Sequence, residues 1–198
     1  RDISLFGSLP NVTILEPCNA EETKMIVRYC LTESQENCVI RLIIGPSPSI
    51  IRLPQDYHLK FGCGAVLTQG DDAVLFAYGP TMLCEALSAA SILKQDGFDL
   101  KVVNMPWLNR VNLEWLEETI GACLEIFVLE DHGPNGALAD VLLNKIHSSK
   151  SLNTKRFHKF GIEGFPAWGT RDEVLEYHGL DGGTLARRIL KATNPENR

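Results

Sequence analysis

The sequence Glu130-Asp131-His132 sets two carboxylates beside an imidazole, so acid–base chemistry or metal binding is possible there. It follows a strongly apolar run, 126–129, and precedes a Gly-Pro-Asn-Gly turn, 133–136. Carboxylate and histidine groups can exchange protons near neutral pH, and both are metal ligands. The alternative is that His132 forms hydrogen bonds within a loop or across a subunit interface. Because no second ligand or nucleophile stands nearby, we favour the structural interpretation.

Two further places have residue types that suit chemistry. Arg41 interrupts an otherwise apolar run, 38–44, and a charge in such a strand must be paired or must project from the strand end. It can bind a substrate anion or pair with a carboxylate, and the sequence leaves both open. Gly79-Pro80-Thr81 opens a helix whose free N–H groups attract anions, although an ordinary strand-to-helix turn is the favoured interpretation.

The elements that position these residues alternate between short apolar runs and amphipathic segments, as in an α/β protein. The first 44 residues predict helix, strand, helix, strand, with Asn19 capping the second helix. A Gly-Pro-Ser-Pro-Ser linker follows at 45–49. Beyond it we expect strands at 73–77, 100–105, 126–129 and 157–160, with helices at 82–94, 113–123, 137–146 and 181–192 and after a capping box at Thr170.

The predicted fold is a mainly parallel sheet with one antiparallel strand and helices on both faces, preceded by a partial α/β domain. The antiparallel strand is assigned to a hairpin of 63–68 with 73–77. Residues 1–50 are expected to be the partial domain and linker, and 51–198 the complete domain. Since residues 1–44 cannot close a core, they should pack on the second domain or on a second copy, or be mobile.

Composition narrows the possible partners. The 198 residues have a formal net charge of -6, which disfavours nucleic acid and anionic membranes as partners. No apolar run approaches the ~20 residues that a membrane span needs. Six cysteines lack C-x-x-C or zinc-site spacing, and several lie in apolar runs. We therefore expect reduced core thiols, a cytoplasmic location and no metal site in the chain.

Several stretches, in this order and at this spacing, resemble the transketolase family. Residues 1–6 and 9–22 resemble the end of that family's pyrimidine-binding domain, and 39–42 with 45–46 resemble its last strand and exit. The likeness continues into the family's C-terminal domain at 70–79, 102–105, 128–132 and 136–138.

The resemblance implies part of a three-domain enzyme that moves a two-carbon ketol unit between sugars. Thiamine diphosphate and a divalent metal such as Mg²⁺ would lie between a pyrophosphate-binding and a pyrimidine-binding domain, usually of two subunits. The cofactor-activating glutamate would lie upstream of residue 1. This chain would then have a structural and dimerisation role, no cofactor of its own, and no activity alone. Its partners would be the missing portions and a second copy, and Arg41, Asp131 and His132 are candidates for substrate binding.

Other members of the group and another class of protein are also compatible with the sequence. A deoxyxylulose-phosphate synthase and the beta subunit of a 2-oxo-acid dehydrogenase share this C-terminal domain, and a non-catalytic module that binds a partner chain is the third alternative. In the resembled family, a second arginine three positions after Arg41 grips the sugar phosphate. Here that position is Ile44, which has no charge or donor. The substrate would then lack a terminal phosphate, or Arg41 or Arg52 would grip it.

Overall fold

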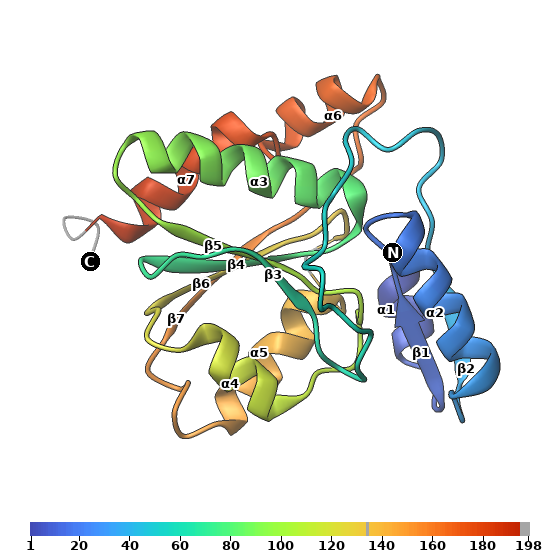
Figure 1. Ribbon diagram of the computed structural model, residues 1–198. Coiled ribbons are helices and arrows are strands. Elements are labelled where there is room, and N and C mark those ends of the chain that lie inside the picture. The colour runs from blue at the N-terminus through green and yellow to red at the C-terminus, as the bar shows by residue number, and fades with distance from the viewer. Residues whose placement is uncertain (134, 195–198) are drawn as a thin grey trace.

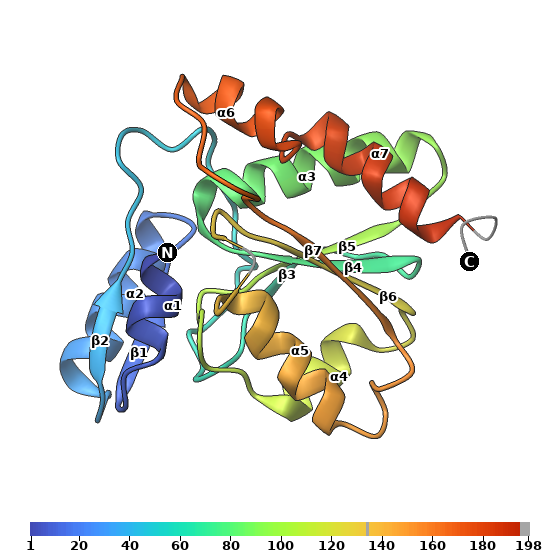
Figure 2. The same cartoon turned by 180° about the vertical axis from the view of Figure 1, so that it is seen from behind.

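The computed structural model describes residues 1–133 and 135–194. A five-stranded sheet lies between two layers of helices, and a smaller unit with a two-stranded sheet packs at one end of it (Figure 1). The predicted fold class is confirmed, because the large sheet is mostly parallel, has one antiparallel strand and is covered by helices on both faces (Figure 2).

The N-terminal unit has the predicted order of helix, strand, helix and strand. Its strands β1 and β2 pair in parallel, and the Asn19 side chain caps α2. β2 ends earlier than the predicted strand over 38–44, so Arg41 follows the strand and does not interrupt it. β2 is also half-exposed and not covered on both faces, and β1 is its one strand neighbour in the described chain. The elements of the unit are α1 (Asp2–Gly7), β1 (Val12–Leu15), α2 (Ala20–Thr32) and β2 (Asn37–Ile40).

The larger unit is built on a sheet with the strand order β3-β5-β4-β6-β7. Its central strand, β4, is buried at every residue. α3, α6 and α7 lie on one side of the sheet, and α4 and α5 on the other (Figures 1 and 2). The elements are β3 (Ala65–Thr68), β4 (Ala73–Ala77), α3 (Gly79–Gln95), β5 (Leu100–Asn104), α4 (Leu113–Ile120), β6 (Glu125–Leu129), α5 (Leu138–Ser148), β7 (Arg156–Phe160), α6 (Arg171–His178) and α7 (Gly182–Thr193).

The predicted hairpin of 63–68 with 73–77 is wrong. β3 is the antiparallel strand, but it pairs with β5. β4 has a parallel partner on each side, which leaves no free edge for β3. The link between the two strands passes close over the start of β5, where a Cβ on Gly70 would lie 2.4 Å from the Asp99 carbonyl oxygen. The four-residue link is therefore a crossing between strands that are not neighbours.

Residues 1–44 pack on the larger unit, which is the first of the three expected arrangements. Buried Ile14 and Ile26 belong to the same hydrophobic core as Met105 and Trp107. The segment 106–110, which follows β5, runs beside β1 and forms an antiparallel bridge from Trp107 to Leu15. This segment covers the edge of β1 that β2 does not use, so the strand has backbone partners on both sides.

Side-chain caps begin three helices of the larger unit, and one of them is the predicted capping box at Thr170. Asn112 caps α4, Thr170 and Glu173 form a capping box on α6, and Asp181 caps α7. Because such caps satisfy the free N–H groups of a first helical turn, they fix where each helix starts. No helix in the described ranges has the length and apolar character to cross a membrane.

All six cysteines are free thiols. Cys18, Cys63 and Cys123 are buried, whereas the other three are only half-buried. Burial is the largest cause of a raised pKa for Cys18 and Cys63, so these thiols resist ionisation. The expectation of core thiols thus holds for half of the set.

Candidate functional site

The carboxyl ends of β4 and β6 meet where the chain's connections diverge. α3 follows β4 onto one face of the sheet, and α5 follows β6 onto the other (Figure 1). A divergence of this kind leaves a crevice outside the strand ends, where open α/β sheets bind ligands. The residues at these ends are Tyr78 with Gly79 and the run 130–132, so two of the three predicted places for chemistry lie together.

Arg41 reaches this crevice from the N-terminal unit. Its Nε donates to Asp2 at 2.6 Å, its Nη1 is ion-paired with Glu16, and Nη1 and Nη2 donate to Asp131 at 3.2 and 3.3 Å. The Arg41 side chain is only 16% exposed. The guanidinium is thus surrounded by carboxylates from α1, from the end of β1 and from the end of β6.

Tyr78 and Gly79 complete the cluster from the end of β4. The Tyr78 hydroxyl donates to Asp131 at 2.9 Å, and Arg41 Cζ lies 5.7 Å from the centre of the Tyr78 ring. Gly79 has a φ of 66°, and a Cβ there would lie 2.0 Å from Glu16 Oε1. Glycine therefore allows the Glu16 carboxylate to approach the N-terminus of α3, where backbone N–H groups favour an anion.

Three carboxylates share one cation in this cluster, and the pKa values reflect the excess negative charge. Burial raises the pKa of Glu16 to about 8, and Asp131 adds to the rise while Arg41 opposes it. Burial is also the largest single influence on the pKa of Asp2 and raises it, but the hydrogen bond to Arg41, the charge of Arg41 and smaller contributions together outweigh burial, and the net pKa is lowered. Since Glu16 is the more buried of these two, burial dominates the pKa of Glu16, whereas the contacts with the cation dominate the pKa of Asp2.

Glu130 and His132 lie on either side of Asp131 in sequence, and both are buried. The Ala139 N–H donates to Glu130 at 3.4 Å, and burial raises the pKa of Glu130 to about 7. His132 Nδ1 donates to the carbonyl oxygen of Gly133 at 2.9 Å, while Nε2 has no hydrogen-bond partner in the described ranges. Of the three candidate residues, Arg41 and Asp131 are in contact, whereas His132 bonds within its own loop.

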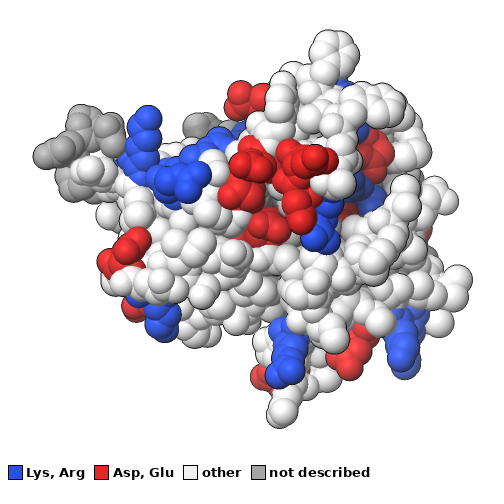
Figure 3. All heavy atoms as spheres, turned by 90° about the horizontal axis from the view of Figure 1, so that it is seen from above, with Lys and Arg blue, Asp and Glu red and all other residues white. Residues whose placement is uncertain are grey.

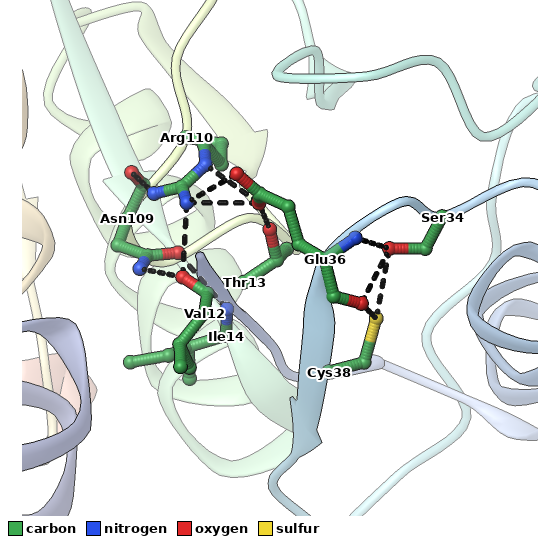
Figure 4. A network of polar contacts seen from close by, with 8 residues as sticks. All are labelled: Val12, Thr13, Ile14, Ser34, Glu36, Cys38, Asn109 and Arg110. Carbon is green, nitrogen blue, oxygen red and sulfur yellow. Dashed lines mark hydrogen bonds and ion pairs between the residues drawn. The ribbon is translucent and has the colours of Figure 1, made fainter. Parts of the chain in front are cut away.

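A second set of polar contacts between the two units lies at the beginning of β1 (Figure 4). Arg110 Nε and Nη2 donate to the two Glu36 oxygens, at 3.1 Å to Oε2 and 2.9 Å to Oε1. Nη2 also donates to the Val12 carbonyl at 3.0 Å, and Asn109 Nδ2 donates to the same carbonyl at 2.8 Å. The Thr13 hydroxyl donates to Glu36 as well. These hydrogen bonds connect the loop after β5 to Val12 of β1 and to Glu36, the residue before β2.

The sequence analysis did not predict these contacts, and it also did not predict a buried carboxylate. Glu22 is fully buried and accepts from the Cys18 N–H at 2.7 Å, the Tyr57 hydroxyl at 2.8 Å and Asn104 Nδ2 at 2.8 Å. Burial raises its pKa. The last two partners lie 35 and 82 positions away, and the one signal in the sequence was the polar Asn104 at the end of an apolar strand.

The acidic cluster does not fit a divalent metal. A guanidinium already lies among its carboxylates, whose oxygens are engaged by Arg41 and Tyr78. Across 1–133 and 135–194, no group of three or more His, Cys, Asp or Glu residues is arranged to hold a metal ion. We therefore assign no metal-dependent step to the residues of this chain.

Comparison with known proteins identifies the family. The family model for the transketolase C-terminal domain matches residues 62–184, more than half of the chain, and the chain belongs to this family. A structure of a split-gene transketolase, an inactive β4 tetramer, superposes with a TM-score of 0.83 at 26% identity and covers 97% of this chain.

Two curated relatives place the chain beside both transketolases and a synthase. A protein of Methanocaldococcus jannaschii described as a transketolase C-terminal section is 28% identical over 99% of this chain. The 1-deoxy-D-xylulose-5-phosphate synthase of Chlorobaculum tepidum is 25% identical over 96% of it. The chain spans 60% of the first relative, 30% of the second and 60% of the split-gene structure.

Proposed function

We propose that this chain is the C-terminal portion of a transketolase-like enzyme that transfers a two-carbon ketol unit between sugars. Its own role is structural, including dimerisation, and it is inactive alone. Thiamine diphosphate and a divalent metal such as Mg²⁺ would bind in the complete enzyme, on the missing pyrophosphate-binding and pyrimidine-binding portions. The free thiols support a cytoplasmic location.

The observation that carries this proposal is that the chain's own residues fill the crevice at the carboxyl ends of β4 and β6. In a ligand-binding α/β domain this crevice receives the ligand. Here Arg41 and Glu16 of the N-terminal unit occupy it, with Asp131 and Tyr78 as their partners. A crevice filled by the chain's own charged residues supports a role in assembling domains, and we propose the same positioning role for Arg41 and Asp131.

The exposed edge of β2 in the N-terminal unit supports the proposal that this chain binds a partner. β2 has β1 as its one strand neighbour in the described chain, and Leu42 and Ile44 beyond it are exposed. Two parallel strands with an exposed edge form a stable sheet only with further strands or another chain. The missing pyrimidine-binding portion would supply such strands.

Reconstitution tests the proposal. The purified chain is assayed for ketol transfer with thiamine diphosphate and Mg²⁺, first alone and then with a chain that carries the missing portions. We expect no turnover from the chain alone and clear turnover from the mixture. Thiamine-diphosphate-dependent turnover by this chain alone would contradict the proposal, as would a mixture in which the two chains bind but stay inactive on all ketol donors.

A second candidate function is synthesis of 1-deoxy-D-xylulose 5-phosphate, and the similarity to the Chlorobaculum tepidum synthase favours it. The reconstituted pair distinguishes the two candidates by product. Formation of 1-deoxy-D-xylulose 5-phosphate without transfer of a ketol unit between sugars would select the synthase.

A further inference from the structure

Three large aromatic side chains project into solvent from the end of the chain that holds α6. Phe165 and Trp168, in the loop between β7 and α6, are 92% and 99% exposed, and Tyr177 on α6 is 75% exposed. Exposed apolar side chains that gather on one surface mark contact sites, and Trp and Tyr are enriched at the energetic centres of protein interfaces. We call residues 161–178, which include α6, the aromatic surface.

The backbone that carries these rings is held in place. The Ala167 N–H donates to His178 Nε2 at 3.1 Å. Because Ala167 precedes Trp168 and His178 follows Tyr177 in the chain, both rings emerge close to this hydrogen bond. The capping box at Thr170 then fixes where α6 begins. A partner would therefore not have to order the loop around Trp168, and binding would cost less conformational entropy.

The charges of the aromatic surface are mostly negative. Residues 161–178 contain four acidic side chains and one arginine. That arginine, Arg171, is ion-paired with Asp172 at 2.9 Å, and Glu173 is engaged in the capping box. The exposed carboxylates of Glu163 and Glu176 have no ion-pair partner among the described residues. Figure 3 shows several acidic side chains gathered on the face that α3, α6 and α7 form.

A polar cavity of about 480 Å³ brings the two unpaired carboxylates to one place. Glu163, Glu176 and Tyr177 all line it. Arg188 of α7 also lines it, but its guanidinium is already held, since it lies 4.4 Å from the centre of the Phe160 ring and donates to a backbone carbonyl. Two carboxylates and a tyrosine ring beside one engaged cation suit the side chain of a lysine or arginine from another molecule.

A smaller cavity, of about 240 Å³, adjoins the polar one, because His178 lines both. Its wall is mostly apolar, and Arg171 and Asp131 add one charge of each sign. An apolar side chain gains free energy by leaving water for such a space. The apolar part of the wall is Met82, Ile162, Val174, Leu175 and Leu180.

We propose that the aromatic surface binds a basic segment of another protein, in which a lysine or arginine lies next to an apolar side chain. The basic side chain would enter the polar cavity, and its apolar neighbour would enter the smaller one. Charge complementarity selects this occupant, because the unpaired carboxylates would repel nucleic acid, an anionic membrane or a second copy of the same surface. The net charge of -6 on the whole chain also attracts a basic partner. This partner is additional to the chains named in the proposed function, and the inference does not depend on that function.

Peptide selection on the full chain tests the proposal. A library of random peptides displayed on phage is enriched on the immobilised wild type, and the enriched peptides are then synthesised with a fluorescent label. Anisotropy gives their dissociation constants. We expect enriched sequences with a lysine or arginine beside an apolar residue, and binding that weakens as the salt concentration rises, because salt screens exposed charges.

Two substitutions, each with a matched control, locate the binding site. Trp168→Ser and Glu176→Lys should each weaken peptide binding at least roughly tenfold, because the first removes the most exposed ring and the second reverses a charge that faces the ligand. Leu31→Ser removes another apolar side chain that is 79% exposed, and Glu118→Lys reverses the charge of another exposed glutamate. Both control variants should bind the peptides as tightly as the wild type does.

Other outcomes would overturn the inference. Enrichment of acidic sequences, of uncharged sequences or of none would reject a basic partner, as would a loss of binding confined to Trp168→Ser. Equal binding by Trp168→Ser, Glu176→Lys and the wild type, with all three equally folded by circular dichroism, would reject this surface. If self-association of the chain, or addition of the chain that carries the missing portions, abolished peptide binding, the surface would belong to the assembly of the enzyme itself.

Discussion

Arg41, which follows β2, and Asp131, which comes two residues after the end of β6, form an ion pair with nitrogen–oxygen distances of 3.2 and 3.3 Å. The pair joins the N-terminal unit to the carboxyl ends of β4 and β6 in the large sheet. Glu16 and Asp2 also contact Arg41, so its loss would leave carboxylates without a cation in a largely buried site. The stability of the contact between the N-terminal unit and the large sheet should therefore depend on this one guanidinium.

Replacing Arg41 by Met should lower the free energy of unfolding by about 3 kcal/mol, because it breaks a buried ion pair and leaves its partners uncompensated. Urea unfolding followed by circular dichroism measures the effect. Arg28→Met, at an exposed arginine of α2, is the control and should change little. If Arg41→Met kept wild-type stability but weakened substrate binding in the complete enzyme, Arg41 would be a substrate ligand.

The contact of Arg110 with Glu36 should show a coupling free energy of about 1 kcal/mol in a double-mutant cycle of Arg110→Ala and Glu36→Ala. The value is modest because the two side chains are 25% and 29% exposed. The same cycle on the more exposed pair of Lys94 and Asp99, 3.9 Å apart, should give a value near zero. Equal coupling free energies in the two cycles would show that donation by two Arg110 nitrogens to Glu36 adds no stability over a single exposed ion pair.

The protonation of Glu16 should make stability depend on pH. Its pKa rises from 4.5 when unfolded to about 8 when folded, so its contribution is fully present below pH 4.5 and is lost as the pH rises to about 8. Glu16→Gln should flatten this fall in the free energy of unfolding. Glu118→Gln, at an exposed glutamate of α4, should leave the slope unchanged. A wild-type slope in Glu16→Gln would assign the effect to other carboxyl groups.

Ile44→Arg should raise kcat/KM for phosphorylated sugars roughly tenfold in the complete enzyme, if the missing arginine explains substrate choice. Ile44 is fully exposed, so the longer side chain meets no steric barrier in this chain. Leu42→Arg, which adds the same charge at another exposed position, is the control. A wild type that already strongly prefers phosphorylated sugars, and is only harmed by Ile44→Arg, would refute the assignment.

The sequence by itself determined the order of helices and strands and where most helices begin. Asn19 and Thr170 cap helices as predicted, because a cap and its target N–H lie within three residues. Burial periodicity acts over similarly short distances. The same local signals placed Gly79 and the run 130–132 after the ends of strands, so the edge of the sheet that holds the cluster was predictable.

Tertiary structure alone decided which strands and charges meet. β3 pairs with β5 because both edges of β4 are taken, and no local signal records which edges are free. Arg41 contacts residues 25, 39 and 90 positions away, and Arg110 meets Glu36 across 74 positions. Such pairings depend on how two units dock and on the cost of leaving a charge buried without a partner, and both are properties of the packed chain.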